Sequence, residues 1–371
     1  MLNALMFFLV SIQVAVAEPV TKTAPEMRGI WVTRWTYNNA ADVREIMNSV
    51  ADAGFNAVFF QVRGQHDAYY ESSIEPWAAR LTGTLGKNPG WDPLQLAVEV
   101  GHSRGLEVHA YINAFPLWKG DVPPASTPEH AIRTDPDWVV ADKEGMPMAD
   151  PDTYQFASPG NSAVRERLQK VAADIDARYD VDGIHLDYLR YPGPQYGHDM
   201  ASLAAWESDG QPNYDDWRRL QVQKATAGVS ASVSSPVTAA VWGIYLNKWG
   251  WKDVSQGHQD YFQDSGALLK SAALDAVIPM IYWPVNPGGR LDFEELTRDH
   301  VSRAHGRHVY AGVRSQPEWG AGQVISAIKA ARRAGAHGVV VFEYSECKPW
   351  FAEIKKEVFQ TAAATPAMTW R

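Results

Sequence analysis

Residues 183–192 read GIHLDYLRYP, and this stretch is the best guide to how the chain folds. Side chains alternate between the two faces of a β-strand, so Ile184 and Leu186 share one face. His185 and Asp187 share the other. In a barrel of parallel strands the apolar face meets the surrounding helices, which turns the second face inward. We therefore expect His185 and Asp187 to point into a barrel, with Asp187 near its mouth.

Seven further stretches rich in β-branched residues alternate along the chain with segments of helical periodicity. The eight expected strands are residues 29–34, 57–63, 106–113, 183–188, 237–243, 276–282, 308–313 and 338–343. Between them, Val43, Ile46, Met47 and Val50 recur at helical spacing, and residues 92–104 and 322–334 show the same pattern. Eight strands with interleaved helices predict an α/β protein with a (β/α)8 TIM barrel, built as one domain over residues 26–360.

A doubly wound open sheet is the main alternative architecture. Such a sheet usually carries a glycine-rich phosphate loop after its first strand, whereas residues 34–37 read RWTY. The stretches after strands two, three and four are long, and residues 114–160 and 191–214 lack clear periodicity. Long loops on one rim of a barrel build its pocket, so we expect both segments to be ordered cleft walls.

The composition excludes some classes of partner. A formal charge of −9 provides no basic surface for nucleic acid. The single cysteine, Cys347, allows no intrachain disulfide and no cysteine-based metal site. The chain holds 15 Trp and 15 Tyr residues, whose rings can stack on sugars, although core packing is the commoner use of such rings.

The first 17 residues resemble a signal peptide. An apolar run over residues 5–17 ends in AVA, which predicts cleavage before Glu18 and an exported protein, periplasmic or extracellular. About 13 apolar residues are too few for a membrane span, which needs roughly 20. We expect no span in the mature chain.

Polar residues on three neighbouring strands are predicted to converge on the barrel interior. Strand two contributes Gln61 and Arg63, and strand three contributes His109, Tyr111 and Asn113 on one face. Buried polar groups cost free energy unless they are partnered, so this convergence favours a functional site. The candidates for substrate binding are Arg34, Arg63, His109, Asn113, His185, Arg190, Tyr282 and Trp283. The alternatives are core histidines, structural hydrogen bonds, and ion pairs of Asp187 with Arg63 or Arg190.

The chain resembles the glycosyl-hydrolase-like 10 family of bacterial exported proteins over roughly residues 26–345. The matching segments are MRGIWV at 27–32, GFNA at 54–57, QVR at 61–63, EPW at 75–77, LTGT at 81–84, PGWDPL at 89–94, GLEVHAYIN at 105–113 and the strand-four segment. This resemblance implies a barrel that acts on peptidoglycan strands freed of their stem peptides. It also implies that Asp187 is the catalytic residue.

Two segments depart from the family pattern. After Asn113, where relatives often continue Asn-Pro-Tyr-Arg, residues 114–117 read AFPL, and the end of strand eight, often Phe-Ser-Tyr, reads FEY at 342–344. Both segments are expected to line the cleft. They leave the substrate preference and the role of Glu343 open.

Glycoside hydrolysis usually needs two carboxyl groups. Glu343 is the prediction for the second, because it ends strand eight on the parity of Val339 and Val341. Glu346, Glu75, Asp67, Asp150 and Asp152 remain alternatives. A metal site built from His66, His109 and His185 lacks recognisable spacing, so we expect no metal and no cofactor. The prediction is therefore a cell-wall glycan hydrolase, with a carbohydrate-binding pseudo-enzyme and an α-glucan hydrolase as alternatives.

Overall fold

Eight parallel strands close into a barrel in the computed structural model, which describes residues 24–149 and 152–370. The predicted signal peptide and Asp150 lie outside these ranges. The strands are β1 (Met27–Val32), β2 (Ala57–Arg63), β3 (Glu107–Asn113), β6 (Gly183–Asp187), β7 (Val237–Trp242), β8 (Ala276–Ile281), β9 (His308–Val309) with β10 (Ala311–Arg314), and β11 (Gly338–Phe342). The predicted seventh strand is divided at Tyr310 into β9 and β10, which both pair with β8. Pairing of β10 with β11 and of β11 with β1 closes the barrel and confirms the predicted fold.

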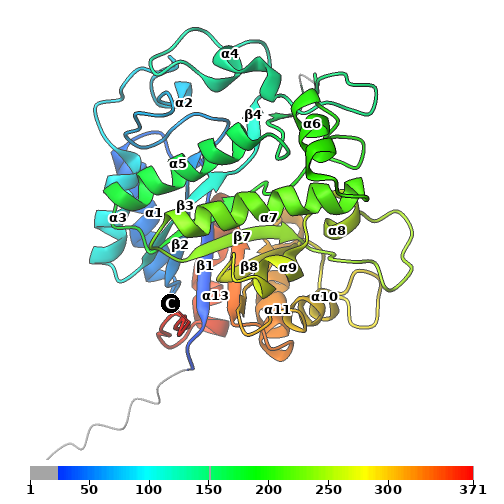
Figure 1. Ribbon diagram of the computed structural model, residues 1–371. Coiled ribbons are helices and arrows are strands. Elements are labelled where there is room, and N and C mark those ends of the chain that lie inside the picture. Colours follow the sequence, from blue (N-terminus) through cyan, green and yellow to red (C-terminus); the bar gives the residue numbers. More distant parts are fainter. Residues whose placement is uncertain (1–23, 150–151, 371) are drawn as a thin grey trace, which may run out of the picture.

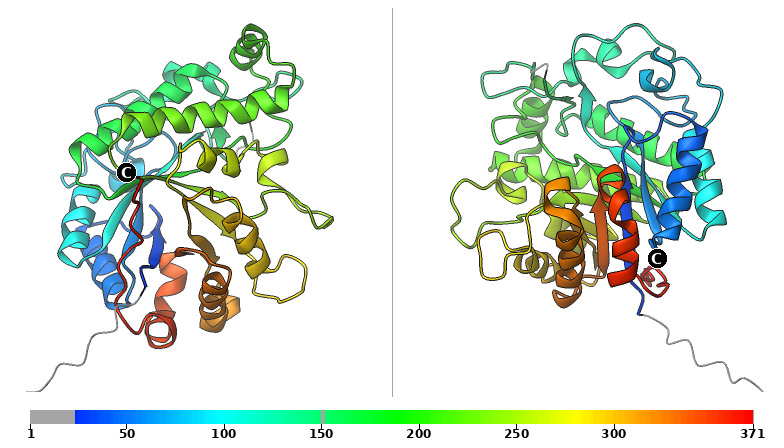
Figure 2. Two further views of the ribbon diagram at one scale, coloured as in Figure 1. Left: turned by 60° about the horizontal axis from the view of Figure 1, so that its bottom comes forward. Right: turned by 180° about the vertical axis from the view of Figure 1, so that it is seen from behind.

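Helices surround the strands on all sides (Figures 1 and 2). The main helices are α1 (Ala40–Asp52), α3 (Pro93–Ser103), α5 (Ser162–Arg178), α7 (Tyr214–Ser232), α9 (Ser265–Lys270), α10 (Phe293–Val301), α11 (Gly320–Arg333) and α13 (Phe351–Val358). The four apolar residues predicted to share a helix face are the buried residues of α1. Asp92, at the predicted start of the second helix, caps α3 by accepting the Gln95 N–H. Within the described ranges, no helix has the length and apolarity to cross a membrane.

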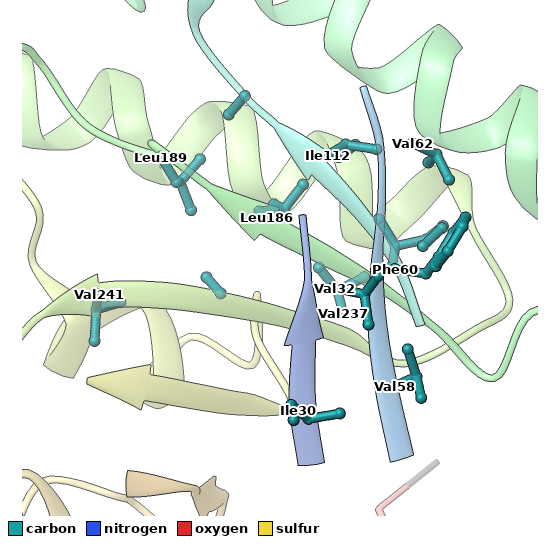
Figure 3. Close-up of a cluster of buried hydrophobic side chains, with 14 of the residues drawn as sticks. Ile30, Val32, Val58, Phe60, Val62, Ile112, Leu186, Leu189, Val237 and Val241 are labelled. Carbon is teal, nitrogen blue, oxygen red and sulfur yellow. The ribbon is translucent and has the colours of Figure 1, made fainter. Parts of the chain in front are cut away.

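Two apolar layers fill the barrel and its surroundings. Figure 3 shows side chains of the outer layer on the barrel strands, such as Ile30, Val58 and Leu186, and this layer also contains buried helix residues such as Val43 and Val171. The inner layer includes Trp31, Phe59, Tyr111, Ile278, Tyr310 and Val340, from strands all round the barrel. The alternation of faces read from strand four therefore holds, because Leu186 packs outward while His185 contacts Trp31 inside.

Segments after β2, β3 and β6 extend from the carboxyl rim of the barrel (Figure 1). They carry the short elements α2 (Ala79–Thr82), β4 (Pro116–Trp118), α4 (Ala131–Thr134), η1 (Pro136–Trp138) and β5 (Gln155–Phe156), with β4 and β5 paired antiparallel, and then α6 (Met200–Asp209). Elsewhere lie α8 (Gly257–Asp260), η2 (Pro317–Trp319), α12 (Tyr344–Cys347) and η3 (Lys348–Trp350). The long loops were predicted, but the helix α6 within residues 191–214 was not.

The C-terminal segment crosses the opposite, amino end of the barrel (Figure 2). The Glu26 N–H donates to the Ala364 carbonyl at 2.8 Å, and the Trp370 indole donates to Asp275 at 2.8 Å. Met368 packs against the inner apolar layer. This end is therefore closed by the chain itself, which leaves the carboxyl end as the open one.

A glycine at the base of β6 makes room inside the barrel. A Cβ on Gly183 would overlap the His109 imidazole Nδ1, and His109 is held by stacking on Phe59 at 4.7 Å. We expect Gly183→Ala to lower the free energy of unfolding by about 1–3 kcal/mol, through overpacking, in a thermal denaturation experiment.

Gly322→Ala is the matched control. Gly322 belongs to α11, and a Cβ added to it would meet no atom within 4 Å. Its unfolding temperature should stay the same or rise, since alanine favours helix over glycine. An unchanged unfolding temperature for Gly183→Ala would contradict the packing described.

Candidate active site

A cavity of about 370 Å³ opens at the carboxyl end of the barrel. Six strands contribute to its lining, which consists of Trp31, Tyr111, Asp187, Tyr188, Arg190, Ala240, Trp242, Met280, Tyr282, Trp283 and Phe342. Seven of these eleven side chains are aromatic. The carboxyl ends of the strands are where enzymes of this fold place their chemistry, so this cavity is the candidate active site.

Asp187 is the one carboxylate among the described residues that line the cavity. Only 9% of the residue is exposed. The Tyr111 hydroxyl donates to its Oδ2 at 2.6 Å, and the Tyr188 backbone N–H donates to its Oδ1 at 2.6 Å. Both oxygens are thus fixed in place, with the carboxylate at the end of β6.

Burial raises the pKa of Asp187 above its usual value, because an apolar surrounding disfavours the charged form. The two hydrogen bonds and the positive charge of Arg190 lower the pKa but do not cancel the effect of burial. A carboxyl group with a raised pKa keeps its proton to higher pH, which suits a general acid.

Arg190 lies among aromatic rings at the edge of the cavity. Its guanidinium carbon is 4.8 Å from the ring centroid of Tyr261, 5.2 Å from that of Tyr188 and 5.4 Å from that of Trp242. Among the described residues, Nε of Arg190 has no hydrogen-bond partner. The guanidinium is therefore positioned by ring contacts. It forms no salt bridge with Asp187, so the expected alternative of a structural ion pair between these two residues does not hold.

Two predicted site residues lie deeper in the barrel than the cavity lining. The Trp31 indole N–H donates to Nε2 of His185 at 3.0 Å, and Nδ1 of His185 is 2.9 Å from the Thr238 hydroxyl. His109 stacks on Phe59 and lies 3.2 Å from Glu107. His185 thus holds the Trp31 ring that lines the cavity, while His109 packs below it.

Arg63 and Asn113 serve the loops of the rim and do not line the cavity. Arg63 is fully buried, binds both oxygens of Glu75 at 2.7 and 2.8 Å, and donates to the Asn113 carbonyl. The Asn113 side chain accepts from Gln61 and donates to the Gly64 carbonyl. These hydrogen bonds tie the segment after β2 to the end of β3.

Arg34 also lies outside the first cavity. It donates to the Tyr154 hydroxyl at 2.6 Å and lies against the ring of Trp35. Of the predicted binding residues, the cavity lining contains Arg190, Tyr282 and Trp283.

The parity argument for Glu343 was wrong. Val340 belongs to the inner layer and Phe342 packs against it, whereas Val339 and Val341 belong to the outer layer. Glu343 does not line the cavity; its carboxylate caps α12 by accepting the Glu346 N–H and contacts the Thr36 hydroxyl at 3.4 Å. The structure thus gives Glu343 a helix-capping position in place of the predicted one.

The other carboxylates named as alternatives also lie outside the cavity lining. Glu75 is paired with Arg63, Asp67 accepts the backbone N–H groups of Gly64 and Gln65, and Glu346 pairs with Arg314. Asp152 lines a second, neighbouring cavity. His66 packs against His130 and Trp138, whereas His109 and His185 flank Phe59, and the described residues contain no group of three or more ligands suited to a metal.

Tyr111 is the residue that the sequence prediction missed. It was recognised as inward-facing but was not assigned a role, although its position two residues before the end of β3 places it opposite β6. Trp31, Tyr188, Trp242, Met280 and Phe342 were also not predicted. Inner parity on a barrel strand was the available signal for all of these except Tyr188, which follows β6 with a positive φ of 52°.

Comparisons with known proteins agree with this architecture. The model of the family described as glycosyl hydrolase-like 10 matches residues 26–317. Glycosyl hydrolase YngK of Bacillus subtilis (strain 168) is 27% identical over 289 residues, which make up 70% of this chain and 54% of YngK. Glycosyl hydrolase DigH of Escherichia coli (strain K12) is 28% identical over 256 residues, or 62% of this chain and 55% of DigH. The chain therefore spans about half the length of these relatives.

Solved structures share the fold at low sequence identity. The PgaB (BpsB) glycoside hydrolase domain from Bordetella bronchiseptica aligns with a TM-score of 0.64 at 14% identity, over 89% of this chain and 98% of that domain. The catalytic domain of the β-amylase from Paenibacillus polymyxa aligns with a TM-score of 0.63 at 12% identity, over 91% of this chain and 100% of that domain. At these sequence identities, both comparisons show a shared barrel fold.

The raised pKa of Asp187 predicts a pH-dependent stability cost. A carboxyl whose pKa is higher in the folded than in the unfolded state favours folding at low pH, where it is protonated. As the pH rises through the folded pKa, the buried group becomes charged and the folded state loses stability. Asparagine has no charge to bury. We expect Asp187→Asn to raise the unfolding temperature by a few degrees at pH 8, and by less at pH 5, in calorimetric scans.

The control is Asp180→Asn: the Asp180 side chain is 94% exposed and lies 3.8 Å from Nδ1 of His102, a solvent-exposed contact that contributes little, so its replacement should leave both scans nearly unchanged. A stability difference between Asp187→Asn and the parent that is equal at both pH values would show that Asp187 carries no burial penalty.

Proposed function

This chain belongs to the glycosyl hydrolase-like 10 family, and we propose that it hydrolyses glycosidic bonds in a bacterial cell-wall glycan. The substrate that we propose is peptide-free peptidoglycan. One observation carries the proposal: the buried carboxyl group of Asp187, the one carboxyl among the described lining residues, faces a cavity walled by aromatic rings at the open end of the barrel. Acting on the cell wall, the enzyme would work outside the cytoplasm, in the periplasm or at the cell surface.

The walls of the cavity suit a sugar ring. Trp242, Tyr282 and Trp283 present flat apolar surfaces, and the C–H faces of a pyranose can stack on such rings. Hydrogen-bond donors are also present at the edge, in the Arg190 guanidinium. Such a mixture of apolar walls and a few polar groups is typical of sites for small molecules and sugars.

Asp187 is proposed to act as general acid. In its protonated form it donates a proton to the oxygen of the departing sugar while the glycosidic bond breaks. Its raised pKa favours this form, and Tyr111 holds the carboxyl group in position before and after the transfer.

The second group is proposed to come from the substrate. Most glycosidases use two carboxylates, but substrate-assisted enzymes use the 2-acetamido oxygen of the sugar as the nucleophile in place of a protein carboxylate. The described lining contains one carboxylate, Asp187, so a polymer of N-acetylated amino sugars fits this cavity better than a glucan does. The same feature fits a carbohydrate-binding protein without turnover, which is the second candidate.

We expect the protein to release soluble fragments from peptide-free peptidoglycan strands, and Asp187→Asn to lower the rate by about 10²–10⁴-fold, the usual contribution of a general acid. Fragments from peptide-free strands, intact peptidoglycan and amylose are measured by mass spectrometry. Asp180→Asn should cleave like the parent protein.

Three results would redirect the proposal. Glycan binding without fragments from any substrate would identify a binding protein. Fragments from amylose alone would identify an α-glucan hydrolase. Full activity in Asp187→Asn would remove the assigned acid.

The hydrogen bond from Tyr111 predicts a shift in the pH profile. Tyr111→Phe removes a donor that stabilises the Asp187 carboxylate, so the pKa of Asp187 should rise further. Because the protonated form is the active one, the alkaline limb of the kcat/KM profile should move to higher pH. Tyr310→Phe alters a tyrosine that contacts His308 and should leave the limb in place. Movement of the limb to lower pH would exclude Asp187 as the acid.

A further inference from the structure

A second cavity of about 610 Å³ adjoins the first one. Tyr188 and Arg190 line both cavities, so they form the wall between them. The rest of the lining consists of Trp35, Lys119, Met148, Asp152, Thr153, Tyr154, Phe156 and Pro192. The wall is packed on its outer side, since Tyr154 and Phe156 each meet the Tyr188 ring edge to face at 5.9 Å.

Trp35 gives the second cavity an exposed aromatic surface. The residue is 57% exposed, although tryptophan is highly buried on average. Two arginines position it: the guanidinium carbons of Arg34 and Arg80 lie 4.5 and 5.0 Å from its ring centroid, and Arg80 donates to its carbonyl at 2.8 Å. A ring that is anchored and still exposed is suited to stacking on a ligand.

The charges of this lining favour an anionic ligand. Among the described residues of this lining, Lys119 and Arg190 are cationic and Asp152 is the one acidic side chain. Nε of Arg190 also has no hydrogen-bond partner within the described part of the chain, and Arg190 lines both cavities. A planar guanidinium and an ammonium group are common partners for a carboxylate.

We propose that the second cavity is a subsite for the neighbouring sugar of the bound glycan, and that it selects a pyranose carrying a free carboxylate. This inference rests on the proposed function. The lactyl group of N-acetylmuramic acid bears such a carboxylate only after the stem peptide has been removed. Stacking on Trp35 would hold the ring, while Lys119 and Arg190 would bind the carboxylate, so the subsite would favour peptide-free strands.

Binding to the Asp187→Asn protein tests the subsite without turnover. The ligand is a peptide-free tetrasaccharide of alternating N-acetylglucosamine and N-acetylmuramic acid, titrated by calorimetry. We expect Trp35→Ala, added to this background, to raise Kd about tenfold, as the loss of one stacked ring does. Met200→Ala is the control, since Met200 is 88% exposed and lies on α6 outside the cavity lining.

The charge is tested with the same tetrasaccharide after methyl esterification of its carboxylates. Esterification should raise Kd about fivefold for the Asp187→Asn protein but much less when Lys119→Gln is added to it, because the interaction lost on esterification is then already absent. Lys329→Gln in the same background, on the exposed side of α11, should behave like the Asp187→Asn protein.

The outcomes separate this inference from the proposed function. Unchanged binding on adding Trp35→Ala, or an equal effect of esterification with and without Lys119→Gln, overturns the subsite even where the unsubstituted protein cleaves glycan. Weakened binding in Trp35→Ala, with the esterification effect lost in Lys119→Gln, supports the subsite even where the parent protein cleaves nothing.

Discussion

The cost of burying the Asp187 carboxylate is the constraint on which the rest of the site depends. Charge is expensive in an apolar surrounding, and this carboxylate offsets part of the cost with hydrogen bonds from Tyr111 and the Tyr188 backbone. Those donors stay in place because β3 and β6 are paired and because the barrel below them is filled. His185 belongs to that filling and holds the Trp31 ring against the cavity. The result is a buried carboxyl group with a raised pKa at the carboxyl end of the barrel.

The barrel and the inward direction of Asp187 could be predicted because both follow from local rules. Period-two alternation decides the face of a strand, and β-branched runs between helices decide the topology. Alternation does not predict how deep in the barrel an inward-facing side chain lies. His109, His185 and Asp187 all face inward, but of these three only Asp187, at the end of its strand, lines the cavity. Arg63 shows a second limit, since its partner Glu75 comes from a loop whose path no local pattern reveals. Glu343 was placed on the wrong face because its parity was matched to the outward-facing Val339 and Val341.

The lining also bears on substrate choice. The described lining of the cavity has one carboxylate, so the proposed hydrolysis needs a nucleophile from elsewhere. An N-acetylated sugar carries one in its acetamido oxygen, on the carbon next to the anomeric carbon. The adjoining cavity behind Tyr188 and Arg190 extends the same reasoning along the polymer. Aromatic surfaces would hold two successive rings, while the cationic side chains would distinguish a free carboxylate from a substituted one. The first cavity is lined mostly by the strands of the barrel, whereas the second is lined by Trp35 and by the segments after β3 and β6.

The anomeric configuration of the newly formed reducing end tests this account most directly. It is read by proton NMR from the first product released from a peptide-free amino-sugar oligosaccharide, before mutarotation mixes the two forms. Attack by the acetamido oxygen followed by attack of water inverts the anomeric carbon twice, so the account predicts a product with the β configuration of the substrate. A product that first appears in the α configuration would contradict it, because a single displacement by water requires a second protein group acting as base.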